Sequence, residues 1–310
     1  MFSFLRKETL SLQLYGKLPL AKDYLRIGSG DGAGRHLREW LDQSFSGAAG
    51  TAAPALPFAM RFMLDAGASP LMGCLWPSSD SGGLRPFPFS VFLERKRKPL
   101  VADVESGLEH AEGVWRRIDS THNSHRNAPD GQSYLGAMRA QTLDLETIDS
   151  EHSSSMDFSP WLEALFGSDG KDGLERVFAG LQMLVPSSPR GPLRLPLVSN
   201  MSPIPQVVAW WNVAVQIGLF PSNQVPSVFF PHQMVDEEEP AFVLFFPRMI
   251  QTGDVRWLSS ARSGSACGPG DFAAGEEARL STGQASSEGA APLTDSLRGA
   301  LLSFSARNST

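Results

Sequence analysis

The stretch PLMGCLWPSSDSGGLRPFPFSVFLE, residues 70–94, holds two short apolar segments joined by a polar turn. The segments are 70–78 and 85–94, and a third of the same kind, ALPFAMRFML, precedes them at 55–64. Short apolar runs bounded by Pro or Gly are typical of buried strands. We therefore predict three strands, and we place the strand at 85–94 at a sheet edge because its prolines cannot donate the hydrogen bonds of a central strand.

Helical periodicity lies on both sides of these segments. Apolar residues recur at i, i+3, i+4 and i+8 over residues 37–45, which predicts an amphipathic helix. A stripe from Val104 to Ile118 predicts a second helix, with Asp103 as its N-cap. Residues 119–133 are polar, and we predict a loop there. Before all of these, the alternation in residues 9–15 predicts a half-buried strand.

The second half continues to mix helices and strands. Helices are predicted from Ser159-Pro160 onward, over 174–181 and over the apolar segment 203–219; strands are predicted at 192–198, 225–230 and 241–246. Trp210 and Trp211 have helical spacing beside valines, so core packing is favoured over a role as partner anchors. After about residue 259 the chain is rich in Ser, Gly and Ala, which predicts a mobile tail. The interspersed elements indicate an α/β fold.

Composition excludes several classes of protein. The 310 residues are 42% apolar and 19% charged, with a net charge of −6, which is globular and lacks the basic balance of nucleic-acid proteins. The two cysteines, Cys74 and Cys267, suit a reducing cytoplasm and form no cysteine-rich zinc motif. We find no signal peptide and no apolar run near the length of a membrane span, so a cytoplasmic location is expected.

The segment RIGSGDGAGRHLREWL, residues 26–41, fits a relaxed GxGxxA nucleotide-binding turn. The preceding KDYLRI is charged and poorly strand-like, and no carboxylate lies about 20 positions on to hold a ribose. A connector in which Asp31 caps the next helix is therefore favoured. Nucleotide or anion binding at Gly28–Gly34 remains the alternative.

No residues with a catalytic or metal-binding pattern stand out. His110, His122 and His125 lack the spacing of metal ligands, and solvated side chains explain them. There is no GxSxG nucleophile motif. In the turn 76–89, Asp80 and Arg85 can hydrogen-bond to one another, and Gly82 and Gly83 permit positive φ, which a structural hairpin explains. We predict no catalytic residue, no cofactor and no metal.

Two motifs resemble those of a known family. The first is LYGKLPLAKDYLRI, with Tyr15, Gly16, Lys17, Leu18, Pro19, Asp23 and Tyr24; the second has Pro77, Ser78, Asp80, Gly83, Arg85, Phe87 and Pro88, with Leu84 inserted between its glycine and arginine. Both resemble the TagF family of accessory proteins of bacterial type VI secretion. The aromatic helix and PSxxF strand of residues 209–230 are similar to the family's second half.

The resemblance implies a three-layer α/β/α sandwich with a mixed sheet over residues 1–260, followed by a tail at 261–310. It also implies a protein that is not an enzyme and that represses type VI secretion post-translationally, by binding an assembly component such as the forkhead-associated scaffold Fha. Twelve of the motif residues, all except Leu18 and Tyr24, are then the candidates for partner binding. An adaptor that promotes secretion is a further alternative.

Overall fold

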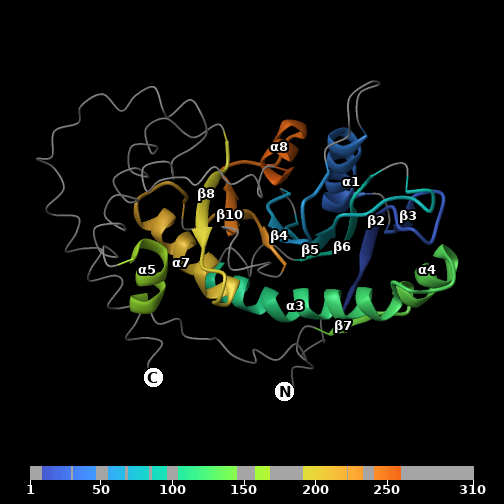
Figure 1. Cartoon of the computed structure of the whole chain (residues 1–310), viewed down its shortest axis with the longest axis horizontal. Coiled ribbons are helices and arrows are strands. Elements are labelled where there is room, and N and C mark those ends of the chain that lie inside the picture. Colours follow the sequence, from blue (N-terminus) through green and yellow to red (C-terminus); the bar gives the residue numbers. More distant parts are fainter. Residues whose placement is uncertain are drawn as a thin grey trace, which may run out of the picture.

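A central sheet with helices on both faces forms the core of the protein (Figure 1). The computed structural model describes residues 9–28, 31–46, 55–66, 69–83, 86–95, 104–144, 158–167, 191–221, 223–232 and 241–259. The predicted α/β class and the three layers are confirmed.

The large sheet has eight strands, and every pairing among its described strands is antiparallel. Its order is β3 (Leu25–Ile27), β2 (Gln13–Gly16), β6 (Phe89–Glu94), β5 (Leu71–Trp76), β4 (Met60–Leu64), β9 (Ser227–Pro231), β10 (Ala241–Phe246) and β8 (Leu193–Leu197). A separate antiparallel pair joins β1 (Thr9–Ser11) to β7 (Thr142–Asp144). The sheet thus differs from the expected mixed sheet, because β4, β5 and β6 are joined in sequence as hairpins, and hairpins make antiparallel pairs.

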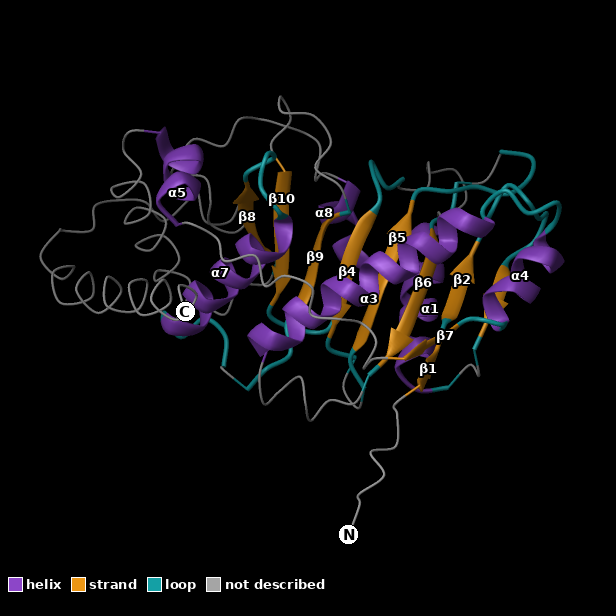
Figure 2. Cartoon of the chain, turned by 90° about the horizontal axis from the view of Figure 1, so that it is seen from below, coloured by secondary structure: helices purple, strands orange, loops and turns teal. Residues whose placement is uncertain are grey.

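Each face of the sheet has its own layer of helices and its own core (Figure 2). One face carries α3 (Val104–His125), α4 (Gly131–Arg139), α5 (Phe158–Phe166) and α7 (Pro203–Gln216). The other carries α1 (Gly32–Phe45), the 3₁₀ turn η3 (Thr252–Asp254) and α8 (Val255–Ser259). Because both faces are covered, the central strands are buried along nearly their whole length and read as continuous apolar runs.

The edge position predicted for residues 85–94 is wrong. Strand β6 lies between β2 and β5, and it begins at Phe89, so that Pro86 and Pro88 precede it and remove no ladder hydrogen bond. The segment KDYLRI, which looked poorly strand-like, contributes the edge strand β3.

The loop predicted over residues 119–133 is confirmed only at 126–130 and is wrong for the rest. Helix α3 continues to His125 and α4 begins at Gly131. Asp119 and His122 continue the buried face of α3 past Ile118, and each has a buried partner described below. Residues 119–125 therefore form a helix whose buried face contains polar side chains, although their polarity had suggested a loop.

Other predictions from the second half are confirmed. Strands β8, β9 and β10 and helices α5 and α7 lie where their patterns placed them, and Trp210 and Trp211 are buried. The predicted helix at 174–181, the cap Asp103 and the tail 261–310 lie outside the described residues. No helix in the described ranges combines the length and the apolar character that a membrane span needs.

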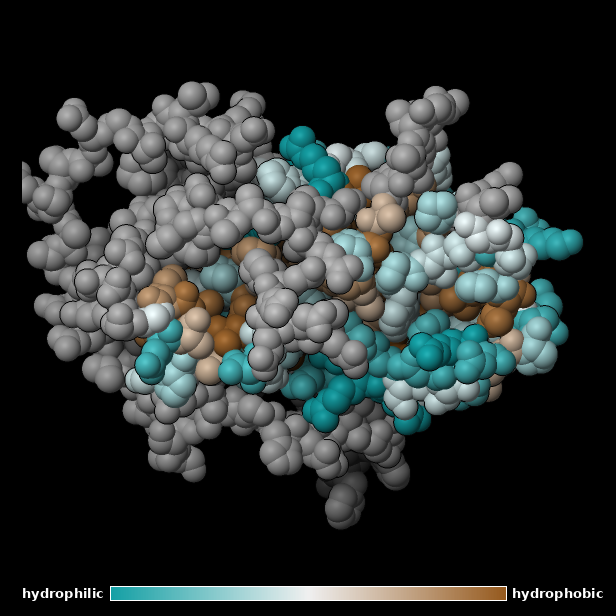
Figure 3. Space-filling model, in the orientation of Figure 1, coloured by the Kyte–Doolittle hydropathy of each residue, from teal (hydrophilic) through white to brown (hydrophobic). Residues whose placement is uncertain are grey.

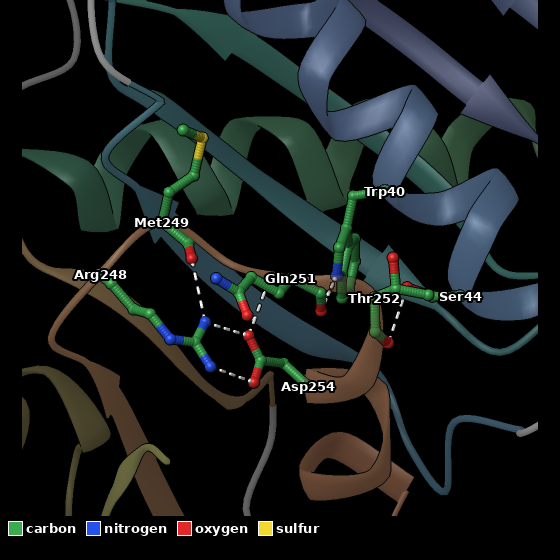
Figure 4. A network of polar contacts seen from close by, with 7 residues as sticks. All are labelled: Trp40, Ser44, Arg248, Met249, Gln251, Thr252 and Asp254. Carbon is green, nitrogen blue, oxygen red and sulfur yellow. Dashed lines mark hydrogen bonds and ion pairs between the residues drawn. The ribbon is translucent and has the colours of Figure 1, made fainter. Parts of the chain in front are cut away.

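A polar network joins α1 to the chain after β10 (Figure 4). Arg248 binds both carboxylate oxygens of Asp254, with N–O distances of 2.7 and 3.0 Å. The backbone amide of Gln251 donates to the same carboxylate at 2.7 Å, and Trp40 Nε1 on α1 donates to the backbone carbonyl of Gln251 at 2.8 Å. The network therefore fixes η3 and α8 against α1 on their face of the sheet.

Candidate functional site

The two motifs form two turns that lie side by side at one end of the sheet, and we call residues 17–24 and 77–88 the paired turns. Gly16 ends β2 and pairs with Phe89, the first residue of β6, while Trp76 ends β5 and pairs with the same residue. Both turns therefore leave the same end of three neighbouring strands. The Ser81 amide donates to the Ala21 carbonyl at 3.0 Å, which joins one turn directly to the other.

A buried ion pair holds the paired turns together. Lys17 Nζ lies 3.5 Å from Asp80 Oδ2, and the two side chains are only 6% and 12% exposed. Asp80 Oδ1 also accepts from the Gly82 amide at 3.2 Å, and Gly83 adopts a φ of +67° as its turn requires. The expected partner of Asp80 was Arg85, which lies outside the described residues; the partner that the structure shows is Lys17 of the other motif.

Three aromatic rings pack beside this ion pair. Tyr24 stacks on Tyr15 with ring centroids 5.4 Å apart, and the edge of Phe87 contacts both rings. Lys17 Nζ lies 5.0 Å from the centroid of the Tyr24 ring, a cation–π distance. The Tyr15 hydroxyl donates to Asp42 Oδ1 at 2.6 Å, and burial is the main cause that raises the pKa of Tyr15. Tyr24 is 40% exposed, so the cluster presents a well-supported aromatic edge to solvent.

Gly16 is required by the close approach of the two motifs. Its φ is +137°, and a Cβ built on it would lie 2.1 Å from the Pro88 carbonyl oxygen. Real side chains do not tolerate such a distance, and this backbone conformation is open mainly to glycine. The Tyr-Gly-Lys sequence therefore fits a place where one backbone runs against another.

The remaining motif residues shape the surface of the paired turns. Pro19, Asp23 and Pro77 are exposed. The Ser78 carbonyl accepts from the Phe87 amide at 2.9 Å, which closes the longer turn. Eleven of the twelve predicted site residues thus lie in or beside the paired turns, and the twelfth, Arg85, lies outside the described residues.

The glycine segment is a close-packed helix start in its described part. Asp31 stands at the N-cap of α1, but its side chain makes no capping hydrogen bond, contrary to the prediction. The Gly34 amide instead donates to Glu94 Oε1 at 2.9 Å, and a Cβ on Gly34 would lie 2.6 Å from Gln13 Oε1. The Glu94 carboxylate therefore accepts the hydrogen bond of one N-terminal helix amide that a bound phosphate would otherwise accept.

One buried charge near this helix start lacks a hydrogen-bonding partner. Arg38 is 5% exposed, and its Nη1 and Nη2 atoms make no hydrogen bond with the described residues. Burial is the first cause that lowers its pKa, and the nearby charge of Arg26 is the second.

A second polar cluster, which the sequence did not reveal, joins α3 to the sheet. Asp119 Oδ2 lies 3.4 Å from Arg61 Nη2 on β4 and 3.0 Å from His232 Nδ1, just after β9. Burial raises the pKa of the neighbouring Cys74 thiol, so this cysteine is not poised as a thiolate nucleophile. The signal that could have located Asp119 is its place four residues after Trp115, on the buried stripe of α3.

His122 is buried, so the prediction of a solvated side chain is wrong for it. Its ring stacks on Trp76 with centroids 4.2 Å apart, and its Nδ1 lies 2.9 Å from the Tyr134 hydroxyl. Burial lowers the pKa of His122 from 6.5 to about 4, which keeps the ring neutral near pH 7. In the part of the chain that the structure describes, no three His, Cys, Asp or Glu side chains are arranged to hold a metal ion.

The protein is thus an α/β protein in which two sequence motifs form turns at one end of an antiparallel sheet. The contacts between these motifs hold the two turns together. A family model described as the TagF N-terminal domain, type VI secretion system-associated, matches residues 13–135. This match supports membership of the TagF family, and it contains both motifs. Residues 209–230, which resembled the family's second half, lie outside the match.

Comparison with curated proteins found no match. Among solved structures, the chain is similar to one described as PA0076 from Pseudomonas aeruginosa PAO1, at 15% identity over 89% of this chain and 97% of that one. The TM-score of 0.40 is too low to support an argument about fold or function.

Proposed function

We propose that the protein is a non-enzymatic, cytoplasmic accessory protein that represses type VI secretion post-translationally, by binding an assembly component such as the Fha scaffold. The observation that supports this most directly is the match of residues 13–135 to a type VI secretion-associated domain. Binding energy, and not bond chemistry, is then the mechanism. The contacts in the paired turns fit this proposal, because Lys17, Asp80 and Tyr15 bind one another or Asp42 in the structure.

Tyr24 is the residue of the paired turns best suited to contact a partner. It is one of two large hydrophobic side chains that are exposed in the described ranges, the other being Met249. Its ring is fixed by Tyr15, Phe87 and Lys17, so little side-chain freedom would be lost on binding. Tyrosine is also enriched among the residues that dominate binding energy.

The test is the release of type VI tube protein into the medium when the protein is overproduced in its own host. We expect release to fall sharply while cellular tube protein stays constant. Tyr24→Ala should weaken the effect, whereas Met249→Ala, a matched exposed residue outside the family match, should leave it unchanged. Unchanged release on overproduction of the wild-type chain would refute repression, and increased release would favour an adaptor that promotes secretion.

A second candidate function is binding of a nucleotide or another anion beside Gly28–Gly34. The buried guanidinium of Arg38, which has no hydrogen-bonding partner among the described residues, favours it. The occupation of the Gly34 amide by Glu94 counts against it. Thermal unfolding with a panel of nucleotides and inorganic phosphate distinguishes the two, because a ligand at 100 times its dissociation constant adds about 2.7 kcal/mol of stability.

A further inference from the structure

The guanidinium group of Arg38 is buried beside the start of α1 without a hydrogen-bonding partner. Arg38 is 5% exposed, and its Nη1 and Nη2 atoms make no hydrogen bond within the part of the chain that the structure describes. A long side chain on a helix lies over the preceding turn, which here contains Gly34. Buried donors are nearly always paired, so two unpaired donors on one side chain point to a missing acceptor.

Arg26 brings a second positive charge to the same place. It lies opposite Tyr15 in the register of β3 and β2, and residues that lie directly opposite share one face of a sheet. This is the face that α1 covers, because the Tyr15 hydroxyl donates to Asp42 on α1. Arg26 is exposed, and β3 is the edge strand of the described sheet. Arg38 is therefore the inner and Arg26 the outer of two neighbouring guanidinium groups.

The carboxylates near the start of α1 do not neutralise this charge. Glu94 accepts a hydrogen bond from the Gly34 amide at 2.9 Å. Burial and then the charge of Arg26 lower the pKa of Arg38, and Glu94 and Asp31 each have a smaller opposing effect. The charged form of Arg38 thus lacks both acceptors and a sufficient counter-charge in the structure.

We propose that Arg38 and Arg26 bind a small oxyanion, such as phosphate, between α1 and β3. The two Nη groups of Arg38 offer parallel donors that match two oxygens of one anion, and hydrogen bonds between charged groups are stronger than neutral ones. Arg26 reaches the anion from the open edge of the sheet. This inference rests on the second candidate function above, and it narrows that function to one class of ligand and one pair of side chains.

Burial favours a small anion over a nucleotide. A guanidinium that is 5% exposed leaves little surface for a base and a ribose. The Gly34 amide, which a nucleotide phosphate would use at a glycine-rich helix start, already donates to Glu94. The site is also separate from the hydrophilic side chains that gather over α3, on the other face of the sheet (Figure 3). General attraction of anions to a polar surface therefore does not describe it.

The experiment compares thermal unfolding of the full chain in sodium phosphate and in sodium chloride at equal ionic strength, with ATP as a further ligand. The line width of the phosphate signal in phosphorus NMR reports binding directly. Arg38→Met removes the buried guanidinium, and Arg26→Gln removes the outer one. The matched control is Arg35→Met, which removes an exposed arginine on the same helix, one that pairs with Glu39. All three variants have the same net charge.

We expect phosphate at about 100 times its dissociation constant to raise the wild-type midpoint by about 5 °C over chloride. Arg38→Met should weaken phosphate binding by roughly tenfold or more, because two charge-assisted hydrogen bonds are lost. Arg26→Gln should weaken it less, and Arg35→Met should bind as the wild type does. Without phosphate, Arg38→Met should be at least as stable as the wild type, because an unpaired buried charge is gone.

The same midpoint in phosphate and chloride would overturn the proposal, as would equal losses of binding in Arg38→Met and Arg35→Met. If Arg38→Met does not fold, wild-type affinity for phosphate in Arg26→Gln would overturn it. A midpoint raised by ATP but not by phosphate would also overturn it, while the second candidate function would stand. Repression of secretion is independent of this site and is tested by the release assay described above.

Discussion

Breaking the buried ion pair between Lys17 and Asp80 should destabilise the protein far more than breaking an exposed one. The charges lie 3.5 Å apart, so their attraction is about 5 kcal/mol at an effective dielectric constant of 20. Desolvation opposes this attraction in the intact pair. When one partner is removed, however, the other remains buried without its counter-charge. We therefore expect Lys17→Met and Asp80→Asn each to lower the free energy of unfolding by about 3 kcal/mol or more.

The double variant K17M/D80N is the informative measurement. It leaves no unpaired charge, so the free energy of unfolding should fall by about 2 kcal/mol less than the sum of the two single-variant losses. Urea unfolding followed by tryptophan fluorescence gives all four free energies. Arg35 and Glu39, which are 56% and 55% exposed and 3.6 Å apart, form a control pair; R35M/E39Q should show a coupling of only about 0.5 kcal/mol. Additive losses at Lys17 and Asp80 would refute the reasoning, because the two turns would then not be joined through this pair.

Four further predictions follow from other contacts. Gly16→Ala should lower stability by several kcal/mol, on the order of a large core substitution, in urea unfolding, because its Cβ would lie 2.1 Å from a backbone oxygen. Because burial lowers the His122 pKa from 6.5 to about 4, the unfolded chain binds more protons in that range, and stability should fall by about 3 kcal/mol as the pH drops through it. His122→Gln should flatten this pH dependence, whereas substitution of the exposed His36 should not. Arg248→Ala should lower the free energy of unfolding by about 1–3 kcal/mol, because Asp254 is 3% exposed and loses two charged hydrogen bonds. An unchanged urea midpoint would mean that these hydrogen bonds do not stabilise the fold. Removal of residues 262–310 should leave a soluble chain with a cooperative thermal transition, and a molten product would contradict this.

The strands were predictable where burial makes the sequence uniform. Strands β5, β9 and β10 are covered on both faces, and each reads as a short apolar run. Their order in the sheet was not predictable, because register and neighbours depend on contacts between segments far apart in the chain. Pairing of β4 with β9, for example, joins residues 60–63 to 228–231. The edge position predicted for β6 failed for a local reason: the prolines end before the strand begins.

The candidate site was predictable as a set of residues but not as a set of contacts. The motif spacing identified Gly16, Lys17 and Asp80, and the structure brings them to one end of the sheet. Within the sequence, Arg85 was the obvious partner for Asp80 because it is near in the chain. A lysine 63 positions away, as the numbering of Lys17 and Asp80 gives, fills that role because β2, β6 and β5 are neighbours in space.

The second half of α3 was predicted as a loop because its residues are polar, and the structure shows why polarity was a poor guide there. An amphipathic helix is recognised by an apolar inner face, but here the inner face contains Asp119 and His122. Their burial is tolerated because β4, the end of β9 and α4 supply Arg61, His232 and Tyr134 as partners. The outer face is polar as well, so the segment has the composition of a loop. What distinguishes the two faces is that the inner polar groups have partners within the fold, whereas Arg117 on the outer face has no carboxylate within ion-pair distance among the described residues.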